Sequence, residues 1–180
     1  MQSLPHLVRY NEPGHVHELT FGTFKGRHVL KTPSRGSIIV QCLGCTCEKQ
    51  GFSLLAYVVM PNHVHLLVHP MEEAYDVGAF LKEFKTSSAK QIFRHEPHLK
   101  AEMQVVKSGE VQSRLWQAGG GYDRNMFGDK AIRASIDYIH ANPVRKEYVR
   151  DPVEWPWSSA GAYFEERSNE FVKLYTGHFD

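Results

Sequence analysis

Fifteen consecutive residues carry the clearest structural signal in the chain: LAYVVMPNHVHLLVH, from Leu55 to His69. Val, Leu and Tyr dominate both halves of this run, which predicts two strands, and Pro61-Asn62 predicts a turn between them. A connection this short makes the two strands antiparallel neighbours. Alternate side chains of a strand point to one face, so His63 and His65 project together while Val64 points to the other face. Two neighbouring imidazoles on a rigid strand can bind one divalent cation.

Hydrophobic periodicity places further elements on both sides of this pair of strands. In chain order we first predict a strand over 15–21, a helix capped by Ser34 or Ser37 that runs to about Gln50, and strands over 52–59 and 63–68. A helix over 77–94, a strand within 115–126, and a helix capped by Asp129 and ended by Pro143 follow. Residues 95–112 have the least regular pattern and are expected to form a flexible insertion. This order predicts an α+β fold, a ferredoxin-like βαββαβ sandwich with an added C-terminal helix.

Composition is that of an ordinary globular protein of 180 residues, with 42% hydrophobic and 23% charged residues and a formal net charge of +1. We expect a single domain over 1–180 whose tail begins at about residue 144. The sequence has neither a membrane-spanning apolar run nor an export signal, which predicts a cytoplasmic protein with no membrane association. Three cysteines between Cys42 and Cys47 suit a reducing compartment, and we expect them to be small buried side chains rather than zinc ligands.

The last predicted helix brings a second set of polar groups, within Asp137-Tyr138-Ile139-His140-Ala141-Asn142-Pro143. Tyr138 and Asn142 are four residues apart and share one helix face, which lies beside an apolar stripe of isoleucines at 132, 136 and 139. An amide oxygen beside two imidazole nitrogens makes a mixed site that suits Mg2+ or Mn2+ and leaves room for phosphate oxygens. A tyrosine next to such a cation can attack a phosphorus atom.

Four stretches, in this order, give the chain a family resemblance over about His17 to Tyr163. Residues 57–68 resemble the HUH motif (His, hydrophobic, His) of single-tyrosine transposases, and Tyr138-Ile139-His140-Ala141-Asn142-Pro143-Val144-Arg145 resembles their nucleophile helix. Trp116-Gln117 and Trp155-Pro156-Trp157-Ser158-Ser159 are similar to segments of the REP-associated tyrosine transposase branch. Asparagine at 142 favours that branch, because the insertion-sequence branch usually has glutamine there.

The resemblance implies a metal-dependent transposase that cuts and rejoins hairpin-bearing, REP-like single-stranded DNA through a covalent 5′-phosphotyrosine. By position it makes Tyr138 the nucleophile and His63, His65 and Asn142 the metal ligands, with a nucleophile-bearing helix added to the ferredoxin-like core. A monomer and a homodimer both remain open. Bases can stack on Tyr122 and Phe127. Positive side chains suited to phosphate contact are Lys82, Lys85, Lys90, Arg94, Arg124, Arg133, Arg145 and Lys146.

Several alternatives fit part of the pattern. A domesticated hairpin-binding protein that no longer cuts would share the fold, and a replication initiator or relaxase would share the HUH chemistry but usually carries further domains. A zinc hydrolase built on a barrel needs about 250 residues and repeated βα units. His15-Val-His17 forms a second His-x-His, which we interpret as ordinary strand residues. Glu147 stands where the family usually has glycine, so the helix is expected to end differently there.

Overall fold

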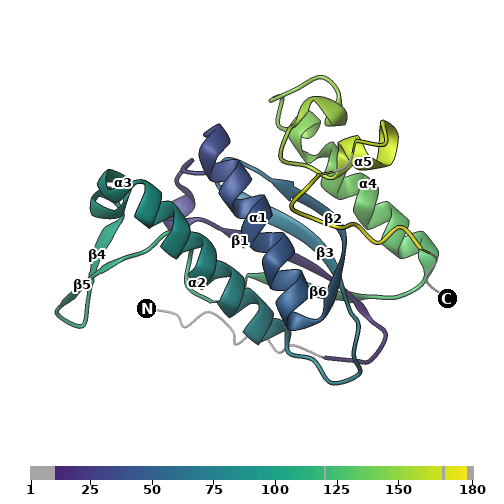
Figure 1. Cartoon of the computed structure of the whole chain (residues 1–180), viewed down its shortest axis with the longest axis horizontal. Coiled ribbons are helices and arrows are strands. Elements are labelled where there is room, and N and C mark those ends of the chain that lie inside the picture. Colours follow the sequence, from purple (N-terminus) through teal and green to yellow (C-terminus); the bar gives the residue numbers. More distant parts are fainter. Residues whose placement is uncertain (1–10, 120, 168, 178–180) are drawn as a thin grey trace.

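A four-stranded antiparallel sheet forms the centre of the computed structural model, which describes residues 11–119, 121–167 and 169–177. The strands are β1 (Val16–Gly22), β2 (Phe52–Val59), β3 (His63–Pro70) and β6 (Tyr122–Met126). Their order across the sheet is β2-β3-β1-β6, and each neighbouring pair is antiparallel. With helices after β1 and β3, this is the ferredoxin-like arrangement that the sequence predicts (Figure 1).

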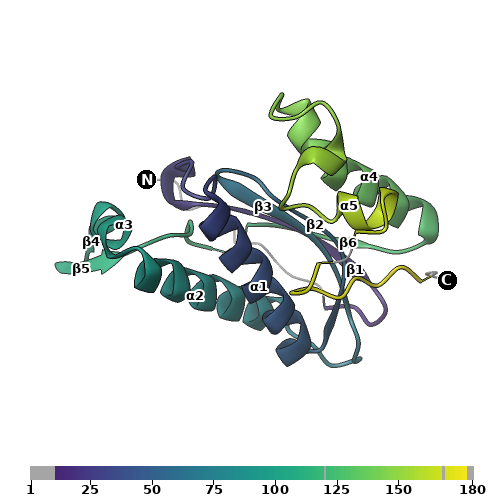
Figure 2. The same cartoon turned by 45° about the horizontal axis from the view of Figure 1, so that its top comes forward.

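Two long helices cover one face of the sheet, α1 (Pro33–Gln50) and α2 (Val77–His95). In Figure 2 they lie side by side as one layer. The apolar core beneath them contains Val64 and Leu66 of β3 together with Phe80 and Phe84 of α2, all fully buried. The carboxylate of Asp76 caps α2, because it accepts hydrogen bonds from two backbone N–H groups in the first turn.

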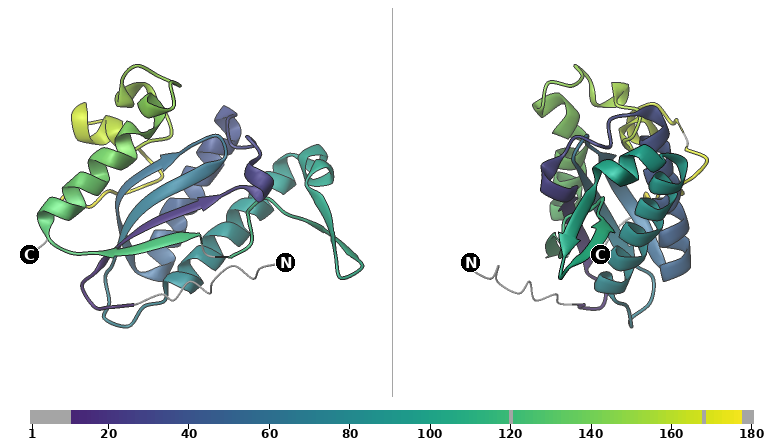
Figure 3. Two further views of the ribbon diagram at one scale, coloured as in Figure 1. Left: turned by 180° about the vertical axis from the view of Figure 1, so that it is seen from behind. Right: turned by 90° about the vertical axis from the view of Figure 1, so that its left-hand side faces the viewer.

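The opposite face of the sheet carries α4 (Asp129–Arg145), which Figure 3 shows on the side away from α1 and α2. Ile132 and Ile139 are buried against Leu67 of β3 and Val58 of β2, and Ile136 is partly buried beside them. The predicted isoleucine stripe is therefore the face by which α4 packs on the sheet. Burying each such side chain contributes about 1.5–3 kcal/mol.

The ends of the helices correct three predictions. Pro143 does not end the last helix, which continues to Arg145, because the ring of a proline accepts a helical φ and the N–H that it lacks is the only bond lost. The N-cap is Gly128 rather than Asp129, which is the first helical residue. The helix predicted to be capped by Ser34 or Ser37 has Thr32 at its N-cap and begins at Pro33, a residue favoured in the first turn.

The backbone at Glu147 corrects a fourth expectation. Glu147 adopts a left-handed conformation, with φ of +59°, so the chain leaves α4 by the route that glycine usually provides. The N–H of Tyr148 bonds to the carbonyl of Pro143 (2.9 Å) in the same turn, which satisfies one of the last helical carbonyls. A non-glycine residue in this region costs about 1 kcal/mol or more.

The segment expected to be a flexible insertion is instead folded. It contains a short helix, α3 (Pro97–Glu102), and a hairpin of β4 (Gln104–Lys107) and β5 (Glu110–Ser113) that projects from the body of the protein (Figure 1). The chain then returns to the sheet through Gly121, where φ is +75° and a Cβ would lie 2.2 Å from the carbonyl oxygen of Thr20. Only glycine fits this close approach.

Residues after α4 cover the edge strand β2. Backbone bonds join Val59 N–H to the Trp157 carbonyl (2.8 Å) and Tyr175 N–H to the Leu54 carbonyl (2.8 Å). The indole of Trp155 donates to the carbonyl of Val59 (2.9 Å), so this tryptophan anchors the segment to β2. No helix in the described part of the chain is long and apolar enough to span a membrane.

Candidate functional site

His63 and His65 lie on the α4 face of β3, with their ring centroids 4.8 Å apart. The Nδ1 atom of His65 is 2.7 Å from the hydroxyl of Thr20, which is its partner across the β1–β3 pair. The Nδ1 atom of His63 is 2.7 Å from the side-chain oxygen of Asn62. Because an amide oxygen only accepts, His63 carries its hydrogen on Nδ1, and its Nε2 keeps a lone pair for a ligand.

Both imidazoles are held in the neutral form. Burial lowers the pKa of His65 to about 3, with smaller effects from His63 and from the positive charge of Arg145. Burial also lowers the pKa of His63, and Lys146 and His28 add to the effect. Neutral imidazole is the form that binds metal ions, so these two residues are ready to act as ligands without losing a proton.

Tyr138 of α4 lies beside this pair. Its ring centroid is 5.9 Å from that of His65, with the ring planes nearly perpendicular, and 42% of its surface is exposed. The guanidinium of Arg145, two turns further along α4, lies 4.8 Å from the centre of the tyrosine ring. A tyrosine, two imidazoles and a guanidinium therefore lie close together within one chain.

Asn142 is buried under the same helix face, one turn after Tyr138. Its amide nitrogen donates to the carbonyl of Tyr138 (2.8 Å), which leaves the amide oxygen as the atom available to a cation. Among the described residues, no cluster of three His, Cys, Asp or Glu side chains can hold a metal ion. Any further ligand beside the two histidines must then be an amide, a hydroxyl, water or a substrate oxygen, and the donor set present fits Mg2+ or Mn2+.

A cavity of about 550 Å³ opens next to these residues, between α4 and the strands β1 and β6. Its wall includes His65 and Tyr138, and also Glu18, Thr20 and Arg124. A larger hollow of about 1,060 Å³ lies between α1, β2 and the C-terminal segment, and neither Tyr138 nor the two histidines line it. Of these two cavities, the smaller is therefore the one that Tyr138 and His65 line.

The positive residues predicted to contact DNA fall into two groups. Arg124, Arg145 and Lys146 surround the candidate site. Arg133 of α4 lies 3.5 Å from the carboxylate of Asp129. The other group lies on α2, across the sheet from Tyr138, and consists of Lys82, Lys85, Lys90 and Arg94. Within this group, the ammonium of Lys85 donates to the carbonyl of Gly119 (2.8 Å).

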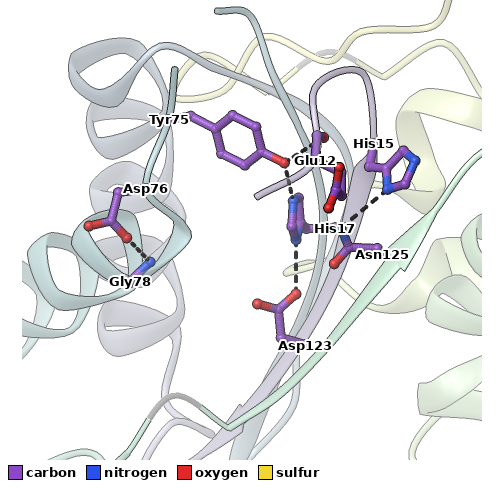
Figure 4. Close-up of polar contacts among 8 residues, drawn as sticks. All are labelled: Glu12, His15, His17, Tyr75, Asp76, Gly78, Asp123 and Asn125. Carbon is purple, nitrogen blue, oxygen red and sulfur yellow. Dashed lines mark hydrogen bonds and ion pairs between the residues drawn. The ribbon is translucent and has the colours of Figure 1, made fainter. Parts of the chain in front are cut away.

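The second His-x-His has other partners (Figure 4). His17 is fully buried, and its two ring nitrogens lie 2.9 Å from the Asp123 carboxylate and 2.9 Å from the hydroxyl of Tyr75. The Tyr75 hydroxyl donates to the carbonyl of Glu12 (2.8 Å), so its oxygen accepts from His17. His15 stacks on Phe127. His17 is therefore a structural residue that ties β1 to β6 and to the start of α2.

Two residues of the site escaped the sequence analysis, Glu18 and Thr20. Both lie on β1 and point to the α4 face, as the alternation of that strand requires. Alternation alone predicts their shared face, but only the register between β1 and β3 places Thr20 beside His65.

Comparisons with known proteins show which family the chain resembles. The family model for IS200-like transposases matches residues 13–142, which include both histidines, the tyrosine and the asparagine. The chain is 30% identical over 115 residues to a Haemophilus influenzae protein whose proposed role is that of a REP-associated tyrosine transposase, which covers 63% of this chain and 62% of that protein. It is 28% identical over 108 residues to the REP-associated tyrosine transposase of Escherichia coli K12, over 60% of this chain and 54% of the relative.

These matches span less than two thirds of the length of either relative. The fold is similar over nearly the whole chain to a solved REP-associated tyrosine transposase bound to a REP hairpin. The TM-score is 0.70 at 18% identity, covering 97% of this chain and 98% of that one. On the family model, which covers most of the chain, this protein belongs to the IS200-like transposase family and resembles its REP-associated tyrosine transposases.

Proposed function

We propose that this protein is a metal-dependent transposase that cuts and rejoins hairpin-bearing single-stranded DNA through a covalent bond between Tyr138 and a 5′-phosphate. One observation carries the proposal: Tyr138 and His65 lie 5.9 Å apart, ring centre to ring centre, in the wall of one cavity. Family membership supports the same chemistry. The fold relative that is bound to a REP hairpin supports a hairpin-bearing strand as the substrate.

His63, His65 and Asn142 are the residues that would hold the cation. When bound, Mg2+ or Mn2+ supplies positive charge that polarises the scissile phosphate and stabilises the transition state. Thr20 and Asn62 orient the two imidazoles through their Nδ1 atoms, which is the usual way in which proteins fix a metal-binding histidine.

The protein's own groups account for the rest of the reaction. The Tyr138 oxygen attacks phosphorus and loses its proton to solvent, while the bond from phosphorus to the 3′-oxygen breaks and that oxygen takes up a proton. Arg145, above the tyrosine ring, lies where it can bind a phosphate oxygen. The reverse step, in which a 3′-hydroxyl attacks the phosphotyrosine, rejoins the strand with no external energy source.

The geometry also supports a monomeric active unit, because Tyr138 and both histidines belong to one chain. Pairing in a duplex keeps a strand stacked and stiff, so the cut lies in a single-stranded part beside the hairpin, which can bend to bring a phosphate to Tyr138. The arginine and lysine at the end of α4 give affinity for phosphate without reading sequence.

The decisive experiment replaces Tyr138 by Phe. Wild-type protein incubated with hairpin-bearing single strands and Mn2+ should give a DNA-shifted protein band on a denaturing gel, and Tyr138→Phe should give none while binding DNA as before. Tyr148→Phe is the matched control, since Tyr148 is similarly exposed (44%) but packs on Trp155. A covalent adduct in the Tyr138→Phe protein would disprove the assignment of the nucleophile.

A further inference from the structure

The cavity proposed to receive DNA has a negatively charged residue type, Glu18, in its wall, although DNA is itself negatively charged. Only 8% of its surface is exposed, and its carboxylate accepts a hydrogen bond from the Ser135 hydroxyl of α4 (3.0 Å). A carboxylate can accept about four hydrogen bonds, and Ser135 is the only partner that the described residues provide. A buried charge with so few partners is costly, so a ligand that brings N–H groups would be favoured here.

Arg124 stands directly opposite Glu18 on the neighbouring strand β6, and both side chains line the same cavity. Adjacent opposite charges on one sheet face usually pair. In the described part of the chain, however, neither a hydrogen bond nor an ion pair joins these two side chains. The cavity therefore presents a hydrogen-bond acceptor on β1 and a donor on the neighbouring strand β6, both available to a ligand.

The position of the cavity restricts the ligand. Tyr138 forms part of its wall, so the group that enters must belong to a nucleotide next to the phosphate that Tyr138 attacks. A carboxylate repels phosphate, which leaves the base as the part that fits. The volume of about 550 Å³ lies in the range of ligand pockets, roughly 300–1,000 Å³. Tyr122, half exposed at the rim, offers a ring on which an unstacked base can lie.

Hydrogen-bonding chemistry then selects one base. Guanine is the base with two neighbouring donors on its Watson–Crick edge, N1–H and N2–H, which match the two oxygens of a carboxylate. It also carries the acceptors O6 and N7, to which arginine binds. Adenine, cytosine and thymine place an acceptor beside their donor and would face Glu18 with a lone pair.

We propose that the cavity between Glu18 and Arg124 binds an unstacked guanine of the nucleotide that flanks the scissile phosphate. The proposal rests on the proposed function, because Tyr138 as nucleophile decides which nucleotide reaches the cavity. Glu18 is then a residue that determines specificity, while Arg145 and Lys146 contact phosphate.

Hairpin-bearing single strands that vary only at the two positions flanking the cut test the proposal. Binding is measured by fluorescence anisotropy in the presence of a chelator, so that no cleavage intervenes, for guanine, adenine and inosine, which lacks the 2-amino group. Wild-type protein should prefer guanine roughly ten-fold at one position, and inosine should lose most of that preference. Glu18→Gln should bind the three strands within about two-fold of one another, because its amide presents one donor and one acceptor.

Glu110→Gln, on the exposed hairpin strand β5, is the matched control and should keep the guanine preference. An equal fall in affinity for all bases in Glu18→Gln would overturn the proposal, as would a wild-type preference for another base or for none. If Glu18→Gln does not fold, Arg124→Gln replaces it. That variant should no longer distinguish guanine from 7-deazaguanine, which lacks N7, and an unchanged distinction would refute the pocket.

The two proposals fail separately. Guanine-dependent binding by a protein that forms no covalent adduct with Mn2+ would retain the base pocket and remove the chemistry assigned to Tyr138. A covalent adduct formed at equal rates with every flanking base would retain the chemistry assigned to Tyr138 and remove the base pocket.

Discussion

The hydrogen bond between Thr20 and His65 allows a test of the metal site that does not touch a proposed ligand. Thr20→Val keeps the shape of the side chain and its preference for a strand, and removes only the hydroxyl. In the wild-type protein that hydroxyl lies 2.7 Å from Nδ1 of His65, whose side chain is 7% exposed. A His65 that binds a cation through Nε2 carries its hydrogen on Nδ1, so the variant leaves this buried ring N–H without its partner and frees the imidazole to turn.

The expected effect has two parts. An unsatisfied buried donor lowers the free energy of unfolding by about 1–3 kcal/mol. Loss of an outer hydrogen bond to a ligating histidine typically weakens metal binding about 10- to 100-fold, which corresponds to about 1.4–2.7 kcal/mol. Mn2+ affinity should thus fall by one to two orders of magnitude in Thr20→Val, with a proportional rise in the Mn2+ concentration needed for adduct formation.

Isothermal titration calorimetry, or the electron paramagnetic resonance signal of free Mn2+, measures the affinity for Mn2+. Urea unfolding measures the stability of each variant. Thr46→Val is the control: its hydroxyl donates to the carbonyl of Cys42 (2.7 Å) in α1, and the residue is buried and remote from the site. Wild-type affinity in Thr20→Val, within about two-fold, would refute the role of His65 as an oriented ligand. Equal losses in both variants would mean that affinity simply follows global stability.

Three further predictions concern acid stability, a helix end and the charges around the nucleophile. Burial lowers the pKa of His65 to about 3 and that of His140 to about 4. The unfolded chain, with histidine near 6.5, therefore takes up these protons first, and the free energy of unfolding should fall by up to about 1.4 kcal/mol per residue and pH unit from pH 6.5 towards 4. Urea unfolding at pH 7 and pH 5 measures this pH dependence, which should be smaller in His140→Asn than in the wild-type protein. The same pH dependence in both proteins would contradict a lowered pKa of His140. Glu147→Gly should raise the free energy of unfolding by about 1 kcal/mol because φ there is +59°, and a less stable variant would count against strain at that residue. At saturating DNA, Arg145→Gln should slow adduct formation about ten-fold or more, because Arg145 lies beside Tyr138. Lys90→Gln, on the other face of the sheet, should slow it less than about two-fold. Adduct bands quantified on gels over time measure both rates, and equal rates in the two variants would contradict the prediction.

The main architecture could be predicted from the sequence because it depends on local patterns. Alternation around His63 and His65 predicts both the strand and the shared direction of the two imidazoles, and the isoleucine stripe predicts which side of the last helix is buried. The order of the elements then leaves few ways to arrange a sheet whose strands are connected by two crossover helices. These inferences need no knowledge of contacts between distant residues.

The partners of the site could not be predicted in the same way. Thr20 reaches His65 only because β1 pairs with β3 in one particular register, and a shift by one residue would turn it to the other face. In the sequence, nothing distinguishes Glu18 from other polar residues of a strand. Its burial depends on the packing of α4, whose Ser135 donates a hydrogen bond to its carboxylate. Residues 95–112 have little apolar periodicity, because the β4–β5 hairpin exposes most of its side chains and so leaves no pattern for a core.

The position of Tyr138 follows from the way in which its helix is buried. Successive residues of a helix are about 100° apart, so the packing of Ile139 on the sheet sets Tyr138 at the margin of the buried stripe, over the histidines of β3. Arg145 is seven residues further on and returns to the same side, which is possible only because the helix continues past Pro143. A helix ending at that proline would present the tyrosine without its neighbouring positive charge. The last turn of α4 is therefore as much a part of the site as the strand that carries the histidines.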